Sequence, residues 1–166
     1  MTAIDPPDHK ASPTARANPE TGEIVATAVF ATGPERLFQA LTTQEICDWW
    51  VRPGVFDTRE WTGELRTGGT WRASGLGGGQ PYALEGEFVE INCPWRLVHT
   101  WHAVGAPGGS ALVTYDLEQL ASGIRLTLRH SGMMNPDILE KTRAGWVTSF
   151  TRLREILGPK ENATPL

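Results

Sequence analysis

The sequence predicts an α+β domain in which a curved antiparallel sheet packs on a long C-terminal helix, with two short helices after the first strand. Two observations predict this class. Apolar residues recur at helical spacing over residues 135–157, and most of the chain between residues 59 and 130 reads as strands with turn signals between them. A run of strands closed by helices at both ends is typical of an α+β fold rather than a parallel α/β sheet.

The chain divides into a tail, one folded domain and a second tail. Residues 1–22 are rich in Pro, Ala, Thr and Asp and contain almost no bulky apolar side chains, so we expect a disordered N-terminal tail. The folded domain is expected over residues 23–158, and residues 159–166 form a C-terminal tail. A folded part of about 140 residues is large enough to bury a real core.

The first elements follow from local signals. Residues 24–31 are small and β-branched, as in a strand. A helix is expected from Pro34, with Leu37, Phe38 and Leu41 on its buried side, and a second short helix over residues 44–50.

The remaining strands are separated by turn residues. Gly75–Pro81 is expected to be a flexible hairpin tip, and Gly86 a bulge or bend that curves the sheet. The strands are predicted at residues 59–66, 70–74, 82–92, 96–102, 111–120 and 123–130.

The long helix begins with Asn135 as its cap and Pro136 at its first position, and Gly158 ends it. Its buried stripe consists of Leu139, Trp146, Phe150, Leu153 and Leu157. Gly145 interrupts the helix at a cost of about 1 kcal/mol relative to alanine. We expect either a close approach of the helix to the sheet there or room for a ligand beneath it.

Composition excludes several classes of function. A net charge of −4 over 166 residues gives no electrostatic case for nucleic acid or an anionic membrane. The sequence has neither an apolar run of the roughly 20 residues that span a bilayer nor a signal peptide, so we expect a cytoplasmic protein. Cys47 and Cys93 are expected to be reduced thiols, and we expect no metal and no cofactor.

Histidine and aromatic residues are the candidates for a site. His99 and His130 either are satisfied polar groups at the edge of the core or project into one cavity and act on a ligand. The seven tryptophans either fill the core or line a pocket. The predicted ligand-binding residues are Trp50, Phe56, Trp71, Phe88, His99, Trp101, Tyr115, His130, Trp146 and Phe150.

Several motifs in order resemble the family related to activators of the heat-shock protein 90 ATPase, within the START-like (SRPBCC) helix-grip superfamily. The matching segments are Ala31–Leu41, Trp49-Trp50 with Pro53, Arg66 with Gly68-Gly69, Gly86–Trp101, Leu128–Gly132 and Gly145–Leu157. The sequence departs from the family pattern at Cys93 and Trp95, and Trp95 is expected at an exposed turn that could mark a contact surface.

The resemblance implies a curved sheet that grips the C-terminal helix, with a cavity between them. Superfamily members bind lipids, steroids, polyketides or hormones, and some are cyclases or hydrolases, so fold alone cannot choose a function. The first hypothesis is binding of a small hydrophobic molecule, and the second is a co-chaperone that binds a chaperone. The third is a cyclase or hydrolase that uses His99 or His130 as acid or base. A monomer or a homodimer fits each hypothesis.

Overall fold

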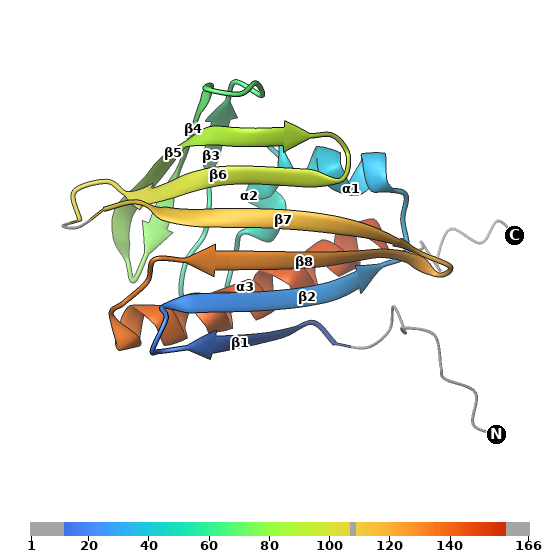
Figure 1. Ribbon diagram of the computed structural model, residues 1–166. Coiled ribbons are helices and arrows are strands. Elements are labelled where there is room, and N and C mark those ends of the chain that lie inside the picture. The colour runs from blue at the N-terminus through green and yellow to red at the C-terminus, as the bar shows by residue number, and fades with distance from the viewer. Residues whose placement is uncertain (1–11, 107–108, 159–166) are drawn as a thin grey trace, which may run out of the picture.

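The computed structural model describes residues 12–106 and 109–158, which form one eight-stranded antiparallel sheet and three helices (Figure 1). The strands lie in the order β1-β2-β8-β7-β6-β5-β4-β3. The elements are β1 (Thr14–Asn18), β2 (Glu23–Phe30), α1 (Pro34–Leu41), α2 (Ile46–Trp49), β3 (Glu60–Gly63), β4 (Thr70–Gly77), β5 (Gln80–Asn92), β6 (Arg96–Ala103), β7 (Ala111–Leu120), β8 (Gly123–Ser131) and α3 (Pro136–Leu157). The α+β class and the curved sheet on a long helix are confirmed.

Strand β1 corrects one expectation. Residues 14–18 fall within the segment predicted to be a disordered tail, yet they pair antiparallel with β2, Thr14 opposite Thr27 and Asn18 opposite Glu23. The guanidinium of Arg143 on α3 also donates to the carbonyl of Ala15. Main-chain hydrogen bonds to a neighbouring edge supply this order, so the strand needs no bulky side chains. Residues 1–11 and 159–166 lie outside the described residues, and their assignment as tails stays a prediction.

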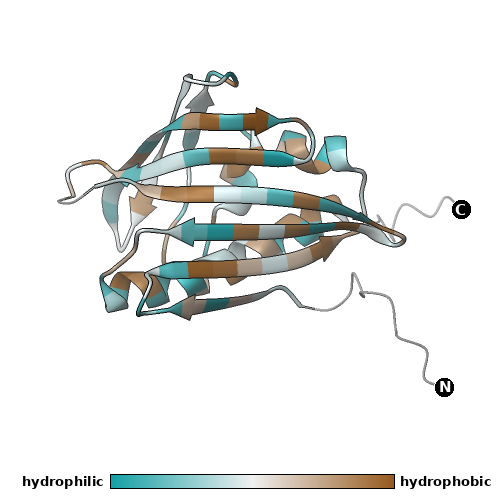
Figure 2. Ribbon diagram, viewed as in Figure 1, coloured by the Kyte–Doolittle hydropathy of each residue, from teal (hydrophilic) through white to brown (hydrophobic). Residues whose placement is uncertain are grey.

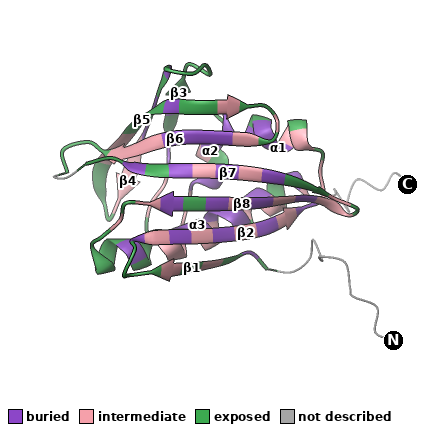
Figure 3. Ribbon diagram, viewed as in Figure 1, coloured by how far each residue is buried: buried purple, intermediate pink, exposed green. Residues whose placement is uncertain are grey.

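The central strands turn one face toward α3. Figure 3 shows buried residues alternating with intermediate ones along β2 and with intermediate or exposed ones along β8, and in Figure 2 apolar residues alternate with mostly polar ones along β8. The registry places His99, Val113 and His130 side by side across β6, β7 and β8, and all three are buried. Because side chains alternate faces in a strand, the buried side chains of these strands share the face that packs on α3.

Helix α3 lies across this face, as Figure 1 shows. The Asn135 side chain accepts hydrogen bonds from the main-chain nitrogens of Asp137 and Ile138 at 2.9 and 3.1 Å, which is the cap that the sequence predicts. All five residues of the predicted stripe are buried. In the part of the chain that the structure describes, no helix has the length and apolarity needed to cross a membrane.

The two short helices close the end of the fold where α3 finishes. Trp49 of α2 is fully buried, donates its indole N–H to the carbonyl of Ala40 at 2.9 Å and packs against Phe150 with ring centroids 6.4 Å apart. Arg152 of α3 donates to the carbonyl of Asp48 at 3.2 Å. These contacts leave the other half of α3, toward its N-terminus, without a covering helix.

The glycine-rich hairpin is shorter at its tip than the sequence predicts. Strand β4 extends to Gly77 and β5 begins at Gln80, so only Gly78 and Gly79 form the turn, both with positive φ (60° and 79°). Two glycines tolerate this left-handed backbone without strain, and the strands can therefore pair up to the turn.

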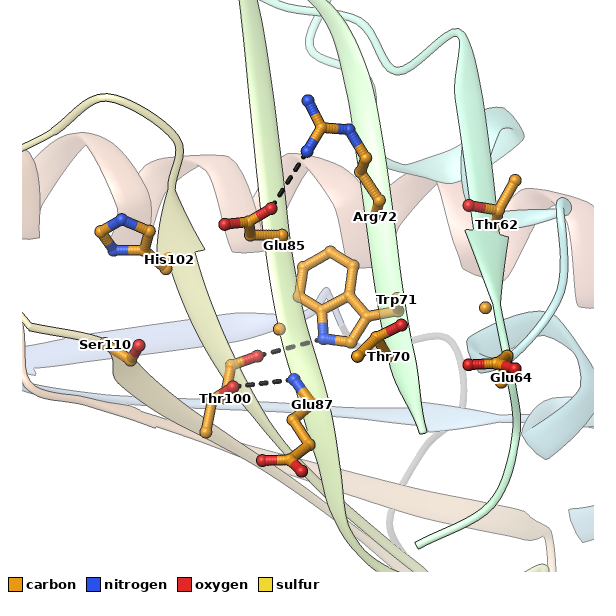
Figure 4. Close-up of a pocket in the computed structure, with 12 residues that line it drawn as sticks. Thr62, Glu64, Thr70, Trp71, Arg72, Glu85, Glu87, Thr100, His102 and Ser110 are labelled. Carbon is orange, nitrogen blue, oxygen red and sulfur yellow. Dashed lines mark hydrogen bonds and ion pairs between the residues drawn. The ribbon is translucent and has the colours of Figure 1, made fainter. Parts of the chain in front are cut away.

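Gly86 has a different role from the predicted bulge, which lies instead between Phe88 and Glu90. Around Gly86, the β5–β6 ladder is interrupted, and the indole N–H of Trp71 donates to the carbonyl of Thr100 at 3.1 Å (Figure 4). A Cβ at Gly86 would overlap both the Thr100 oxygen and the Trp71 nitrogen. Glycine is therefore required here by the close approach of the indole.

We predict that Gly86→Ala lowers the free energy of unfolding by about 1–3 kcal/mol, the usual cost of overpacking a tight site. Urea denaturation followed by circular dichroism measures the change. The matched control is Gly109→Ala, where an added Cβ would meet no atom within 4 Å and should change stability by about 0.5 kcal/mol or less. Equal stability of the two variants would contradict this account of Gly86.

Candidate functional site

The candidate site is a cavity of about 580 Å³ between the first half of α3, the β4–β5 hairpin and residues 50–58. Its volume lies within the range of about 300–1,000 Å³ that is usual for small-molecule sites. The lining residues are Trp50, Arg52, Val55, Phe56, Thr58, Gly77, Gly78, Tyr82, Leu84, Trp101, Ile138, Lys141, Thr142, Gly145, Trp146 and Ser149.

The structure brings four of the ten predicted site residues to this cavity. They are Trp50, Phe56, Trp101 and Trp146. The other six do not line it: Phe88, His99, Tyr115, His130 and Phe150 are buried in the core, and Trp71 lies between that core and the outer face of the sheet.

Hydrogen bonds hold the loop wall of the cavity. The hydroxyl of Thr58 donates to the carbonyl of Trp50, and that of Tyr82 to the carbonyl of Asp57, both at 2.8 Å. The Asp57 carboxylate accepts from the main-chain N–H of Leu76 on β4 at 2.9 Å, and this bond is the main reason that its pKa is lowered. The loop is thus fastened to the hairpin and can keep an apolar wall in place.

A second stripe of α3 forms the helical wall. Ile138, Thr142, Gly145 and Ser149 are spaced by four, three and four residues, so they share one face beside the buried stripe. A Cβ at Gly145 would meet only the ring of Phe56, at 3.5 Å. Of the two explanations that the sequence left open, the geometry therefore favours room in the cavity over close packing against the sheet.

Aromatic rings form the floor of the cavity. The ring centroid of Trp50 lies 5.1 Å from that of Trp101 and 6.2 Å from that of Trp146, and those two are 5.8 Å apart. Such tilted and edge-to-face pairs add about 0.5–1.5 kcal/mol each beyond burial of their area. The floor is therefore rigid, and it offers a ligand flat apolar surface.

His130 lies beneath this floor and anchors it. The indole N–H of Trp146 donates to His130 Nδ1 at 3.0 Å, so the imidazole is neutral and carries its proton on Nε2. Burial lowers the pKa of His130 to about 3, with a smaller effect from His99, and burial lowers the pKa of His99 to about 4. Both rings are uncharged at neutral pH.

Among the described residues, the buried donors Trp50 Nε1 and His130 Nε2 have no hydrogen-bond acceptor. Burial raises the pKa of Tyr115, and the nearby Trp50 indole opposes this shift, but the two groups do not meet hydrogen-bond geometry. Unpartnered buried donors are costly, so this interior would accept an oxygen atom from water or a ligand. Within the described residues, no group of His, Cys, Asp and Glu side chains could hold a metal ion.

Residues 31–158 match the family described as Activator of Hsp90 ATPase homolog 1-like protein. The chain belongs to this family. No curated protein matches it in sequence.

Solved structures of similar fold come from several bacteria. A protein from Chromobacterium violaceum is 24% identical, with a TM-score of 0.76 over 84% of this chain and 99% of its own. A protein from Mycobacterium smegmatis is 17% identical, with a TM-score of 0.75 over 92% and 98%. The AHSA1 protein from Silicibacter pomeroyi is 23% identical, with a TM-score of 0.67 over 81% and 96%. At these identities the likeness establishes the helix-grip fold.

A second depression, of about 730 Å³, lies on the solvent face of β3–β6 (Figure 4). Its one cationic side chain, Arg72, is already paired with Glu85 at 3.0 Å, and Glu64 pairs with Arg66 outside the depression. It also lacks apolar walls apart from Trp71. The inner cavity is therefore the better candidate for a binding site.

Sequence reasoning missed most of the polar lining. Arg52, Thr58 and Tyr82 lie in a loop and on a hairpin whose positions depend on distant contacts. The stripe of Thr142, Gly145 and Ser149 was readable, because small side chains at helical spacing beside a bulky stripe indicate a face that does not fill the core.

We predict that stability falls as the pH decreases from about 6.5 toward 5. The unfolded histidine pKa is about 6.5, above the folded values of about 3 and 4, so the unfolded chain takes up protons first. Each histidine contributes a slope of up to about 1.4 kcal/mol per pH unit. Urea denaturation at several pH values measures it.

The variant that tests this assignment is His130→Asn, which keeps an acceptor for the Trp146 N–H. Between pH 6 and 5, we expect the free energy of unfolding of this variant to change with pH about half as steeply as that of the original protein. The slope is compared rather than the absolute stability, because the substitution itself costs stability. An unchanged slope would show that His130 is not a neutral buried group.

Proposed function

We propose that this protein binds a small hydrophobic molecule in the cavity between the sheet and α3. The observation that carries the proposal is the cavity itself, floored by Trp50, Trp101 and Trp146 and left open by Gly145. A ligand there would gain about 25 cal/mol for each Å² of apolar surface removed from water.

The proposal requires no catalytic group. His99 and His130, the acid–base candidates, are buried and do not line the cavity, and their low pKa values keep both rings neutral at neutral pH, so neither is present as an imidazolium acid. Chaperone binding rests on the name of the family alone and stays a prediction.

We predict that Gly145→Leu weakens binding of the neutral fluorescent probe N-phenyl-1-naphthylamine at least tenfold, because the new side chain occupies the cavity. Gly145→Ala is the matched control. Its Cβ makes only an ordinary contact with Phe56, so probe affinity should change less than about twofold, and stability should rise by about 0.5–1 kcal/mol.

Fluorescence titration gives both affinities, and circular dichroism verifies that each variant is folded. Equal probe affinity in the original protein and both variants would contradict the proposal, since the probe would then bind elsewhere.

A further inference from the structure

The polar side chains of the cavity lining divide into two groups. The hydroxyls of Thr58, Tyr82 and Thr142 donate to main-chain carbonyls, those of Trp50, Asp57 and Ile138, at 2.7–2.8 Å. These hydroxyls are already satisfied by the protein and serve to hold the walls.

The second group consists of Arg52, Lys141 and Ser149. None of the three side chains makes an ion pair or hydrogen bond with any described residue. Ser149 is only 3% exposed and lines the cavity from α3. Its hydroxyl oxygen is not fully enclosed by the protein, since the enclosed unpartnered side-chain atoms of the described residues are Trp50 Nε1 and His130 Nε2. The Ser149 hydroxyl is therefore available to a ligand in the cavity.

The charges of the lining are all of one sign. The half-buried Arg52 lines the cavity from the loop and the exposed Lys141 lines it from α3, and the described lining contains neither Asp nor Glu, although the chain as a whole has a net charge of −4. The carboxylate of Asp57, next to the lining residue Phe56, is engaged by Arg59 and the Leu76 N–H. Asp137, one helical turn before Lys141, forms no ion pair with it. The cavity is therefore a local positive site on an acidic protein.

We propose that the ligand is an amphipathic organic acid. This inference rests on the proposed function, because it assigns the class of molecule that the cavity holds. The apolar body would pack on the tryptophan floor, and the anionic group would be held by Arg52 and Lys141 through charge-assisted hydrogen bonds. Ser149 supplies a further donor to an oxygen of the same ligand.

Two fluorescent probes with the same ring system distinguish the contribution of the anionic group to binding from that of the apolar rings. Anilinonaphthalene sulfonate carries an anionic group, and N-phenyl-1-naphthylamine lacks it. We expect the sulfonate to bind at a single site and to bind there more tightly than the neutral probe does. The double variant Arg52→Gln/Lys141→Gln should weaken sulfonate binding about tenfold and change the affinity for the neutral probe less than about twofold.

The control is Arg125→Gln/Arg129→Gln, which removes two positive charges from the outer face of β8 and should leave both affinities unchanged. If the control weakens sulfonate binding as much as the cavity variant does, or if the cavity variant has no effect, the acid is not recognised by Arg52 and Lys141. The proposed function is not contradicted by that result if Gly145→Leu still prevents binding of the neutral probe. If neither probe binds at one saturable site, the proposed function fails and the inference fails with it.

Discussion

The hydrogen bond from the Trp146 indole to His130 holds α3 against the sheet. It joins the middle of the helix to β8 at 3.0 Å, in an interior where both partners are almost fully buried. Such a bond requires a neutral imidazole, which burial ensures by lowering its pKa. The buried stripe of α3 sets the rotation of the helix about its axis, and this bond adds a polar contact in that orientation, in which Gly145 and Ser149 face the cavity while Phe150 faces the core.

The cavity stays open because rigid groups surround it on several sides. Interlocked indoles cannot collapse into it without losing their ring contacts, and the loop wall is fastened to the hairpin through Thr58, Tyr82 and Asp57. The helix contributes small side chains in place of bulky ones. An open interior at this position is thus a consequence of how the core is packed, with α1 and α2 closing only the far end of the fold.

The strands and the helix were readable from sequence because alternation and helical spacing reveal which side chains face inward. Edge strand β1 was not, since Thr14–Asn18 turns only the small side chains of Ala15 and Ala17 toward the core and is ordered mainly by main-chain pairing with β2. The same limit applies to the site. Periodicity places Trp101 and Tyr115 on inward faces alike, but only the tertiary arrangement decides that Trp101 borders the cavity and Tyr115 lies in the core.

The central claim is that a ligand reaches an interior space floored by indoles, and the indole N–H signals of the protein test it directly. In a ¹⁵N-labelled sample titrated with anilinonaphthalene sulfonate, the account predicts saturable shifts for Trp50, Trp101 and Trp146, with Trp49 and the exposed Trp95 little changed. Single Trp→Phe substitutions assign the signals. Shifts confined to Trp95, or none at any indole, would contradict an accessible cavity beneath α3.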